Sequence, residues 1–212
     1  MTTNITKIAG IVLVAVALTA CKKDDAPAPV SKAEAKTITN LHAPNDVIDR
    51  QTGQVVEKKP FVKFSFAKGQ AVADGEAWDI AFKGTTIIVN GGSTTLDEVT
   101  RNGQAAAAIL TAVFDEVKAV PEATEWKQDS NENYAIPRGG GNGWYNYNPQ
   151  TYVISPIPGR VLLFRDAAGK GYAKVEILSY YKDAPANPNP FQNESAYYTF
   201  RYVYQPAGVQ FE

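Results

Sequence analysis

The segment "AYYTFRYVY", residues 196–204, alternates large aromatic side chains with smaller or polar ones. The aromatic side chains recur at every second position: Tyr198, Phe200, Tyr202 and Tyr204. Successive side chains of an extended chain point to opposite faces, so these four rings share one face. A strand of an antiparallel sheet with one packed face shows this alternation. The segment therefore predicts a strand whose aromatic face lies in a hydrophobic core.

Other segments on the N-terminal side repeat the two-residue period. They are "FVKFSF" (61–66), "WDIAFK" (78–83), "RVLLFR" (160–165) and "YAKVEILSYY" (172–181). In the second of them, Trp78, Ile80 and Phe82 are expected on one face. The turn sequence "DAAGKG" (166–171) predicts that the last two segments form a hairpin. We therefore predict an all-β, mostly antiparallel single-domain fold, sandwich or barrel-like, with long loops at 122–151 and 182–195.

The segment "NGQAAAAILTAVFDEVKAVP", residues 102–121, carries two opposing signals. Four consecutive alanines favour a helix. The part "AILTAVF" also suits a buried strand, and the neighbouring segments are predicted strands. We expect a strand over 107–114, with a helix as the alternative.

Composition excludes several classes of protein. A formal net charge of −1 gives no basic excess for a nucleic-acid partner. One Cys and one His cannot supply the roughly four ligands of a Cys/His zinc site, and a single Cys forms no disulfide within the chain. No nucleophile elbow, phosphate-binding loop or zinc-protease motif is present, and His42 is interpreted as a surface residue in a turn-rich segment. We expect no enzymatic activity, and no metal site is evident.

The first 40 residues have the features of an export and anchoring signal. The uncharged run 8–20 is shorter than the roughly 20 residues of a membrane span and has the proportions of a secretory signal. It leads into "LTAC" (18–21), which resembles a bacterial lipobox, whose cysteine becomes acylated. "KKDD" (22–25) is similar to the export signal of Bacteroidota surface lipoproteins, the alternative being a solvated charge run. We expect a signal peptide at 1–20, lipidated Cys21, a flexible tether over 21–40 and one β domain over 41–212.

The segment "GWYNYNPQTYVISP", residues 143–156, gathers aromatic side chains among Gly, Asn and Pro. Its candidate ligand-binding residues are Trp144, Tyr145, Tyr147 and Tyr152. Aromatic side chains on a loop can hold a flat apolar ligand or a sugar face. The alternative is that they cover one end of the sandwich or barrel.

Three segments together resemble the HmuY family. They are "FVKFSFAKGQAV…EAWDIAFKGTTIIVN" (61–90), "WYNYNPQTYVISPIPGRVLLFRDAAGKGYAKVEILSYY" (144–181) and "SAYYTFRYVY" (195–204). The resemblance implies an all-β lipoprotein on the outer membrane of Bacteroidota, exposed at the cell surface and in some members shed. It implies capture of haem, free or from a haem-carrying protein, and delivery to a TonB-dependent outer-membrane receptor. In this family two axial His, or Met, hold the iron.

The chain departs from the family pattern in its iron ligands. Its one His, His42, precedes the similar segments, and Met1 would leave with the signal peptide. Tyr can also ligate haem iron, so the resemblance makes Tyr152 the best candidate for a metal ligand here. The first hypothesis is a surface lipoprotein that binds haem or a related planar ligand for iron acquisition. The alternative is a surface binding or adhesion module for a glycan or protein, with haem ligation lost.

Overall fold

The computed structural model describes Met1 and residues 34–212. The expected signal peptide, Cys21 and most of the expected tether lie outside the described residues. Residues 34–212 belong to one unit. The part of the chain that the structure describes holds no helix with the length and hydrophobicity of a membrane span.

The larger of the two main sheets has five antiparallel strands. Their spatial order is β1 (Lys36–His42), β15 (Ser195–Gln205), β14 (Tyr172–Tyr181), β13 (Arg160–Arg165) and β9 (Ala106–Thr111). The predicted hairpin is confirmed, because Arg165 pairs with Tyr172 across the turn. The tether expected over 21–40 is wrong for residues 36–40, since β1 begins at Lys36 and pairs with β15.

The second main sheet has four antiparallel strands. Their order is β5 (Gln70–Val72), β4 (Val62–Ser65), β6 (Ile80–Lys83) and β7 (Thr86–Val89). Its inner face meets the aromatic face of β15: Phe64 packs edge to face on Phe200, with ring centroids 5.4 Å apart, and Phe82 packs on Tyr198 at 4.8 Å. Two open sheets therefore enclose the central core, and the predicted all-β fold is confirmed as a sandwich rather than a closed barrel.

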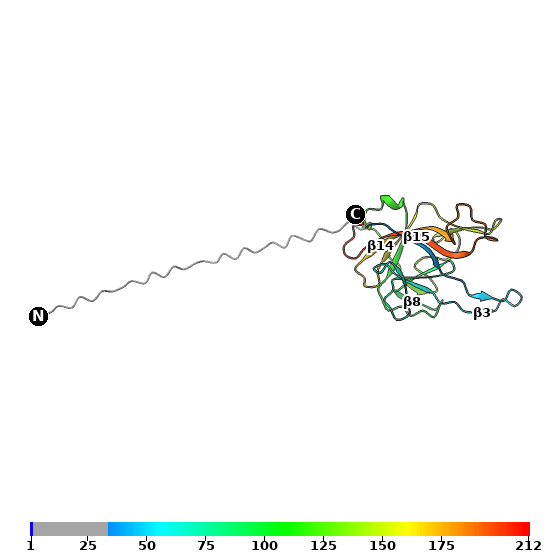
Figure 1. Cartoon of the computed structure of the whole chain (residues 1–212). Helices are drawn as coiled ribbons and strands as arrows, with labels where there is room; N and C mark the ends of the chain where they lie inside the picture. The colour runs from blue at the N-terminus through cyan, green and yellow to red at the C-terminus, as the bar shows by residue number, and fades with distance from the viewer. Residues whose placement is uncertain (2–33) are drawn as a thin grey trace. The chain divides into compact units, whose positions relative to one another are not determined.

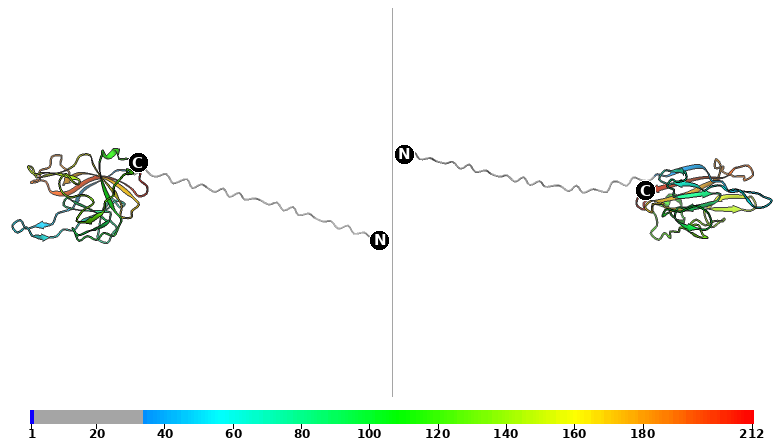
Figure 2. Two further views of the ribbon diagram at one scale, coloured as in Figure 1. Left: turned by 180° about the vertical axis from the view of Figure 1, so that it is seen from behind. Right: turned by 90° about the horizontal axis from the view of Figure 1, so that it is seen from below.

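Short strand pairs extend from this sandwich. They are β2 (Val47–Ile48) with β3 (Val55–Glu57), β8 (Gly92–Thr94) with β10 (Asp129–Asn131), and β11 (Tyr145–Asn148) with β12 (Val153–Pro156). The β2–β3 hairpin projects from the body of the domain, as Figure 1 and the left view of Figure 2 show. Its aliphatic residues Val47, Ile48, Val55 and Val56 are all exposed.

The outer face of each main sheet carries a smaller hydrophobic cluster. Val161, Leu163 and Val203 of the five-stranded sheet pack against Phe114 and Phe211. Ala81 and Ile88 of the four-stranded sheet pack against Trp78 and Tyr134. Both sheets are thus covered on two faces, which explains why β6, β7 and β13 are almost wholly buried.

Residues 102–121 form a strand followed by one short helical turn. β9 covers Ala106–Thr111, and a 3-10 turn covers Phe114–Glu116. The predicted strand is confirmed but ends before 114. Six ladder positions against β13 override the helix propensity of the alanines, and Ala106 and Ala107 are fully buried.

Trp78 corrects one detail of the predicted alternation. It packs with Ala81 and Ile88 on the outer face of the four-stranded sheet, whereas Ile80 and Phe82 lie in the central core. The chain bends at Asp79, before β6 begins at Ile80. The carboxylate of Asp79 accepts hydrogen bonds from Phe66 N and Ala167 N, both at 2.8 Å, which stabilises this bend. The two-residue period therefore does not extend back to Trp78.

Candidate functional site

The β11–β12 hairpin exposes two of the four predicted aromatic residues, Tyr147 and Tyr152. Its turn begins at Asn148, whose side-chain oxygen accepts hydrogen bonds from Gln150 N at 2.9 Å and Thr151 N at 3.2 Å. This Asx turn explains why "NPQT" reverses the chain. The turn ends at Tyr152, which adopts a φ of 61°. A tyrosine in this left-handed region is uncommon, and such strain often marks a functional position.

Tyr152 meets an aromatic ring from a second loop. The ring of Phe191, in the loop that joins β14 to β15, lies 5.8 Å from that of Tyr152 at an angle of 76°. Phe191 is 79% exposed, Tyr152 55% and Tyr147 47%. We call these three residues the aromatic tip. It exposes ring surface to solvent from two segments, the β11–β12 hairpin and the loop before β15.

Trp144 and Tyr145 do not belong to the aromatic tip. Trp144 is 2% exposed, and its indole N–H donates to Thr85 O at 2.9 Å. Its ring contacts Tyr145 at 4.9 Å and Tyr198 at 5.2 Å. Trp144 is therefore a core residue, and its predicted role in stacking on a ligand is wrong. Tyr145 is partly buried against the same core, which corresponds to the alternative that these residues cover one end of the sandwich.

The buried tyrosines Tyr180, Tyr181 and Tyr198 stabilise the fold. Burial raises the pKa of Tyr180 to about 12 and that of Tyr198 well above its usual value. The hydroxyl of Tyr198 donates to Gly84 O at 2.8 Å, and that of Tyr181 accepts from Ile154 N at 3.0 Å. Among the tyrosines of the 143–156 segment, Tyr147 and Tyr152 are exposed and Tyr145 is partly buried.

His42 lies on the surface, as expected. Its ring is exposed and stacks on Tyr197 of the adjacent strand, with centroids 4.1 Å apart and planes 8° from parallel. Within residues 34–212, no group of three or more His, Cys, Asp or Glu side chains is placed to hold a metal ion.

A cleft of about 1090 Å³ lies apart from the aromatic tip. It is bounded by the base of the β2–β3 hairpin, the turn at 74–76, the loop 95–102 and the segment around Tyr134. Its floor is the outer face of the four-stranded sheet, where Lys63, Lys83 and Thr86 stand. We call it the ion-paired cleft, because Lys63 binds Asp74 and Lys83 binds Asp46, both at 2.7 Å.

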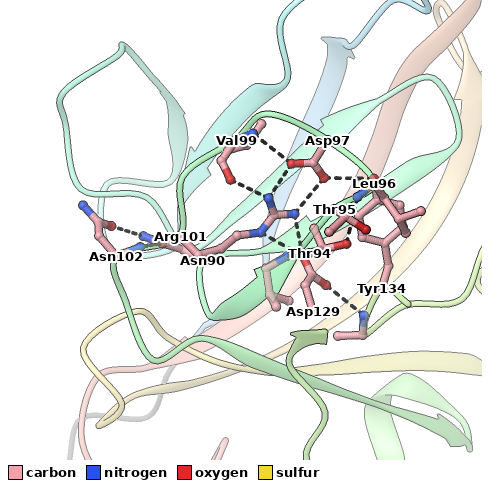
Figure 3. Close-up of polar contacts among 12 residues, drawn as sticks. Asn90, Thr94, Thr95, Leu96, Asp97, Val99, Arg101, Asn102, Asp129 and Tyr134 are labelled. Carbon is pink, nitrogen blue, oxygen red and sulfur yellow. Dashed lines mark hydrogen bonds and ion pairs between the residues drawn. The ribbon is translucent and has the colours of Figure 1, made fainter. Parts of the chain in front are cut away.

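One buried arginine supports the wall of this cleft (Figure 3). The guanidinium of Arg101 lies between two carboxylates and donates to Asp129 at 2.8 Å and to Asp97 at 2.9 Å. Its side chain is 2% exposed, that of Asp129 0% and that of Asp97 8%. Tyr134 donates its hydroxyl hydrogen to Asp97 at 2.9 Å. The loop 95–102 is therefore tied through Arg101 to β10, which lies far away in sequence.

The pKa values of the two carboxylates shift in opposite directions in this environment. Burial raises the pKa of Asp129, in spite of hydrogen bonds from Ala135 N and Arg101. Burial acts on Asp97 in the same direction, but hydrogen bonds from Arg101, Val99 N and Tyr134 outweigh it and lower its pKa. Burial and the bond to Asp97 in turn raise the pKa of Tyr134. Asp97 therefore carries the more stable negative charge, at the edge of the cleft.

Sequence reasoning missed Phe191 and the ion-paired cleft. Phe191 lies in "NPNPFQNE" (187–194), where a large apolar residue in a polar loop was an available signal. The cleft had no such signal, because Lys63, Asp97 and Tyr134 come together only through the fold.

A model of the HmuY protein family matches residues 57–202. This range begins in β3 and ends in β15, so it includes both main sheets apart from β1. No curated protein matches the chain.

Proposed function

The chain belongs to the HmuY family, and we propose that it is a surface lipoprotein that captures haem or a related planar ligand for iron acquisition. The family is associated with haem binding. The observation that carries the proposal for this chain is the aromatic tip, where Tyr152 and Phe191 converge from two loops. Exposed rings of this kind can pack on the faces of a flat apolar ligand.

The residues of this chain fit ligation of haem iron by a tyrosine phenol, but not by two His or two Met side chains. The chain has one His and one Met, so neither two His nor two Met can ligate iron within it. A phenol is an alternative axial ligand. We assign this role to Tyr152, because the residue is exposed, its backbone is strained and Phe191 packs against its ring. Haem would supply the bound iron, and the protein would supply the phenol oxygen and the ring contacts.

The connectivity of the sheet supports capture at a surface. β1 begins beside Tyr202 and runs to Tyr197, so a tether joining at Lys36 enters near the C-terminal end of β15. The loop that carries Phe191 joins β14 to the opposite end of β15. An acylated Cys21 would anchor the protein in the outer membrane, where the partners of the aromatic tip would be haem, a haem-carrying protein or a TonB-dependent receptor. Shedding of the protein would leave the same tip available.

Titration of haemin into the protein that begins at Cys21 tests the proposal. We expect a shifted Soret band at micromolar haemin in the oxidised state. Tyr152→Phe keeps the ring beside Phe191 and removes the oxygen, so it should abolish the spectrum of a phenolate-bound iron. Tyr147→Phe is the matched control and should keep that spectrum.

Two outcomes contradict this proposal. No Soret change under either oxidised or reduced conditions would exclude haem capture and favour the alternative surface module for a glycan or protein. A spectrum that Tyr152→Phe leaves unchanged would exclude Tyr152 as the ligand.

A further inference from the structure

The ion-paired cleft is a second cavity whose chemistry differs from that of the aromatic tip. None of the residues that line it belongs to the aromatic tip. Its volume of about 1090 Å³ slightly exceeds the range of roughly 300–1,000 Å³ that is typical of small-molecule sites. The cleft is therefore large enough for a ligand of more than one ring.

The cleft is lined by equal numbers of positive and negative charges. The cations are Lys58, Lys59, Lys63, Lys83 and Arg138, and the anions are Asp46, Asp74, Glu76, Asp97 and Glu98. Five charges of each sign leave the lining with no net charge to select an anion or a cation as a whole. Lys58 and Glu98 pair at 2.9 Å and connect the two walls, the β2–β3 side and the loop 95–102. A neutral ligand is favoured by this balance.

Cations cover the aromatic rings of the cleft. The ammonium of Lys63 lies 5.8 Å from the ring centre of Trp78, and that of Lys83 lies 5.5 Å from that of Phe61. The guanidinium of Arg138 lies 5.3 Å from the ring centre of Tyr134. A flat apolar ligand would have to displace these charges from rings and carboxylates, which is costly. A polar ligand can instead bind to the charges where they are.

Hydroxyl groups match the polar atoms that the cleft offers. An ammonium only donates hydrogen bonds and a carboxylate only accepts them, whereas a hydroxyl does both. Each neighbouring pair, such as Lys63 with Asp74, can thus bind one hydroxyl or two adjacent ones. The Arg101 network holds the wall at Asp97 and Tyr134 before any ligand arrives (Figure 3). Such preorganisation lowers the entropic cost of binding.

We propose that the ion-paired cleft binds a neutral oligosaccharide, independently of the aromatic tip. Vicinal hydroxyls supply the paired donors and acceptors, a chain of sugar rings matches the volume, and neutrality matches the charge balance. The site would let a surface protein hold a glycan while the tip holds a different ligand.

A titration series followed by amide NMR tests this proposal. The probes are the neutral maltotetraose, cellotetraose and N-acetylchitotetraose, the anionic tetragalacturonate and the cationic chitosan tetramer. We expect saturable shifts with at least one neutral probe, at the Trp78 indole N–H and the amides of residues 95–102. Lys63→Met and Asp74→Asn should each weaken that binding by about tenfold, because each removes a charged hydrogen-bond partner.

Two controls separate this site from the proposed haem function. Lys118→Met changes a lysine outside the cleft and should leave the sugar affinity unchanged. Tyr152→Phe should also leave it unchanged, so failure of haem binding would not be mistaken for failure here. The proposal is overturned if no neutral probe binds, if only a charged probe binds, or if the shifts lie outside the cleft.

Discussion

The aromatic tip and the ion-paired cleft both contain aromatic residues, but they present them in opposite ways. At the tip, Tyr152 and Phe191 expose ring surface to solvent and contact each other. In the cleft, Trp78 and Tyr134 are 4% and 8% exposed, and charged groups lie over their rings. The surroundings of a ring therefore decide its ligand chemistry: exposed faces suit a flat apolar ligand, whereas covered faces leave the charges as binding groups.

The support of the two regions differs as well. A buried, fully hydrogen-bonded arginine fixes the cleft wall, whereas the tip rests on a short turn and a long loop. Rigid support should make mutations within the Arg101 network costly for folding, and mutations at the tip costly mainly for binding. The following predictions test this contrast, in order of decreasing effect.

Arg101→Met should have the largest effect on stability. It leaves the wholly buried Asp129 without its cationic partner, and removing one member of a buried ion pair costs about 3–5 kcal/mol. Urea unfolding followed by circular dichroism would measure the change. Arg138→Met is the matched control in the same cleft and should change stability by less than about 1 kcal/mol, because Arg138 is exposed. An Arg101→Met protein as stable as the wild type would show that the network does not support the cleft.

Trp144→Phe should lower the free energy of unfolding by about 1–3 kcal/mol, since it leaves Thr85 O without its donor and opens space in the core. Tyr152→Phe should change it by less than about 0.5 kcal/mol, because the exposed hydroxyl stabilises little. Thermal unfolding of both variants under one condition gives the comparison. Equal effects on stability would mean that Trp144 and Tyr152 do not differ in role as their burial indicates.

Asp97 should make the smallest of these contributions to stability, and that contribution should depend on pH. Its pKa is lowered in the folded state, so its carboxylate stabilises the fold above the ordinary Asp value of 3.8. That contribution is lost as the pH falls through the lower, folded-state pKa. The free energy of unfolding, measured with denaturant across the acid range, should therefore decline more steeply with falling pH for the wild type than for Asp97→Asn. Parallel curves for the two proteins would contradict the lowered pKa.

Some features followed from the sequence because they depend on local alternation. The strand at 196–204, the hairpin at 160–181 and the all-β class were predictable, since a two-residue period places side chains on alternate faces. The family was also within reach, because its similar segments are strands with distinctive aromatic residues. The sequence also identified the 143–156 segment as a candidate site, although it did not distinguish the exposed Tyr147 and Tyr152 from the buried Trp144.

Only the tertiary structure decided which aromatic residues face solvent and which groups meet in the cleft. Trp144 and Tyr152 lie in the same segment, yet Trp144 packs on Tyr198 of β15 and Tyr152 on Phe191 of the loop before β15. Arg101 binds Asp129 although nothing in the sequence connects them. Sequence period determines the face on which a side chain lies. What covers that face depends on how the two sheets stack and where the long connections return, and this arrangement arises only when distant segments pack together.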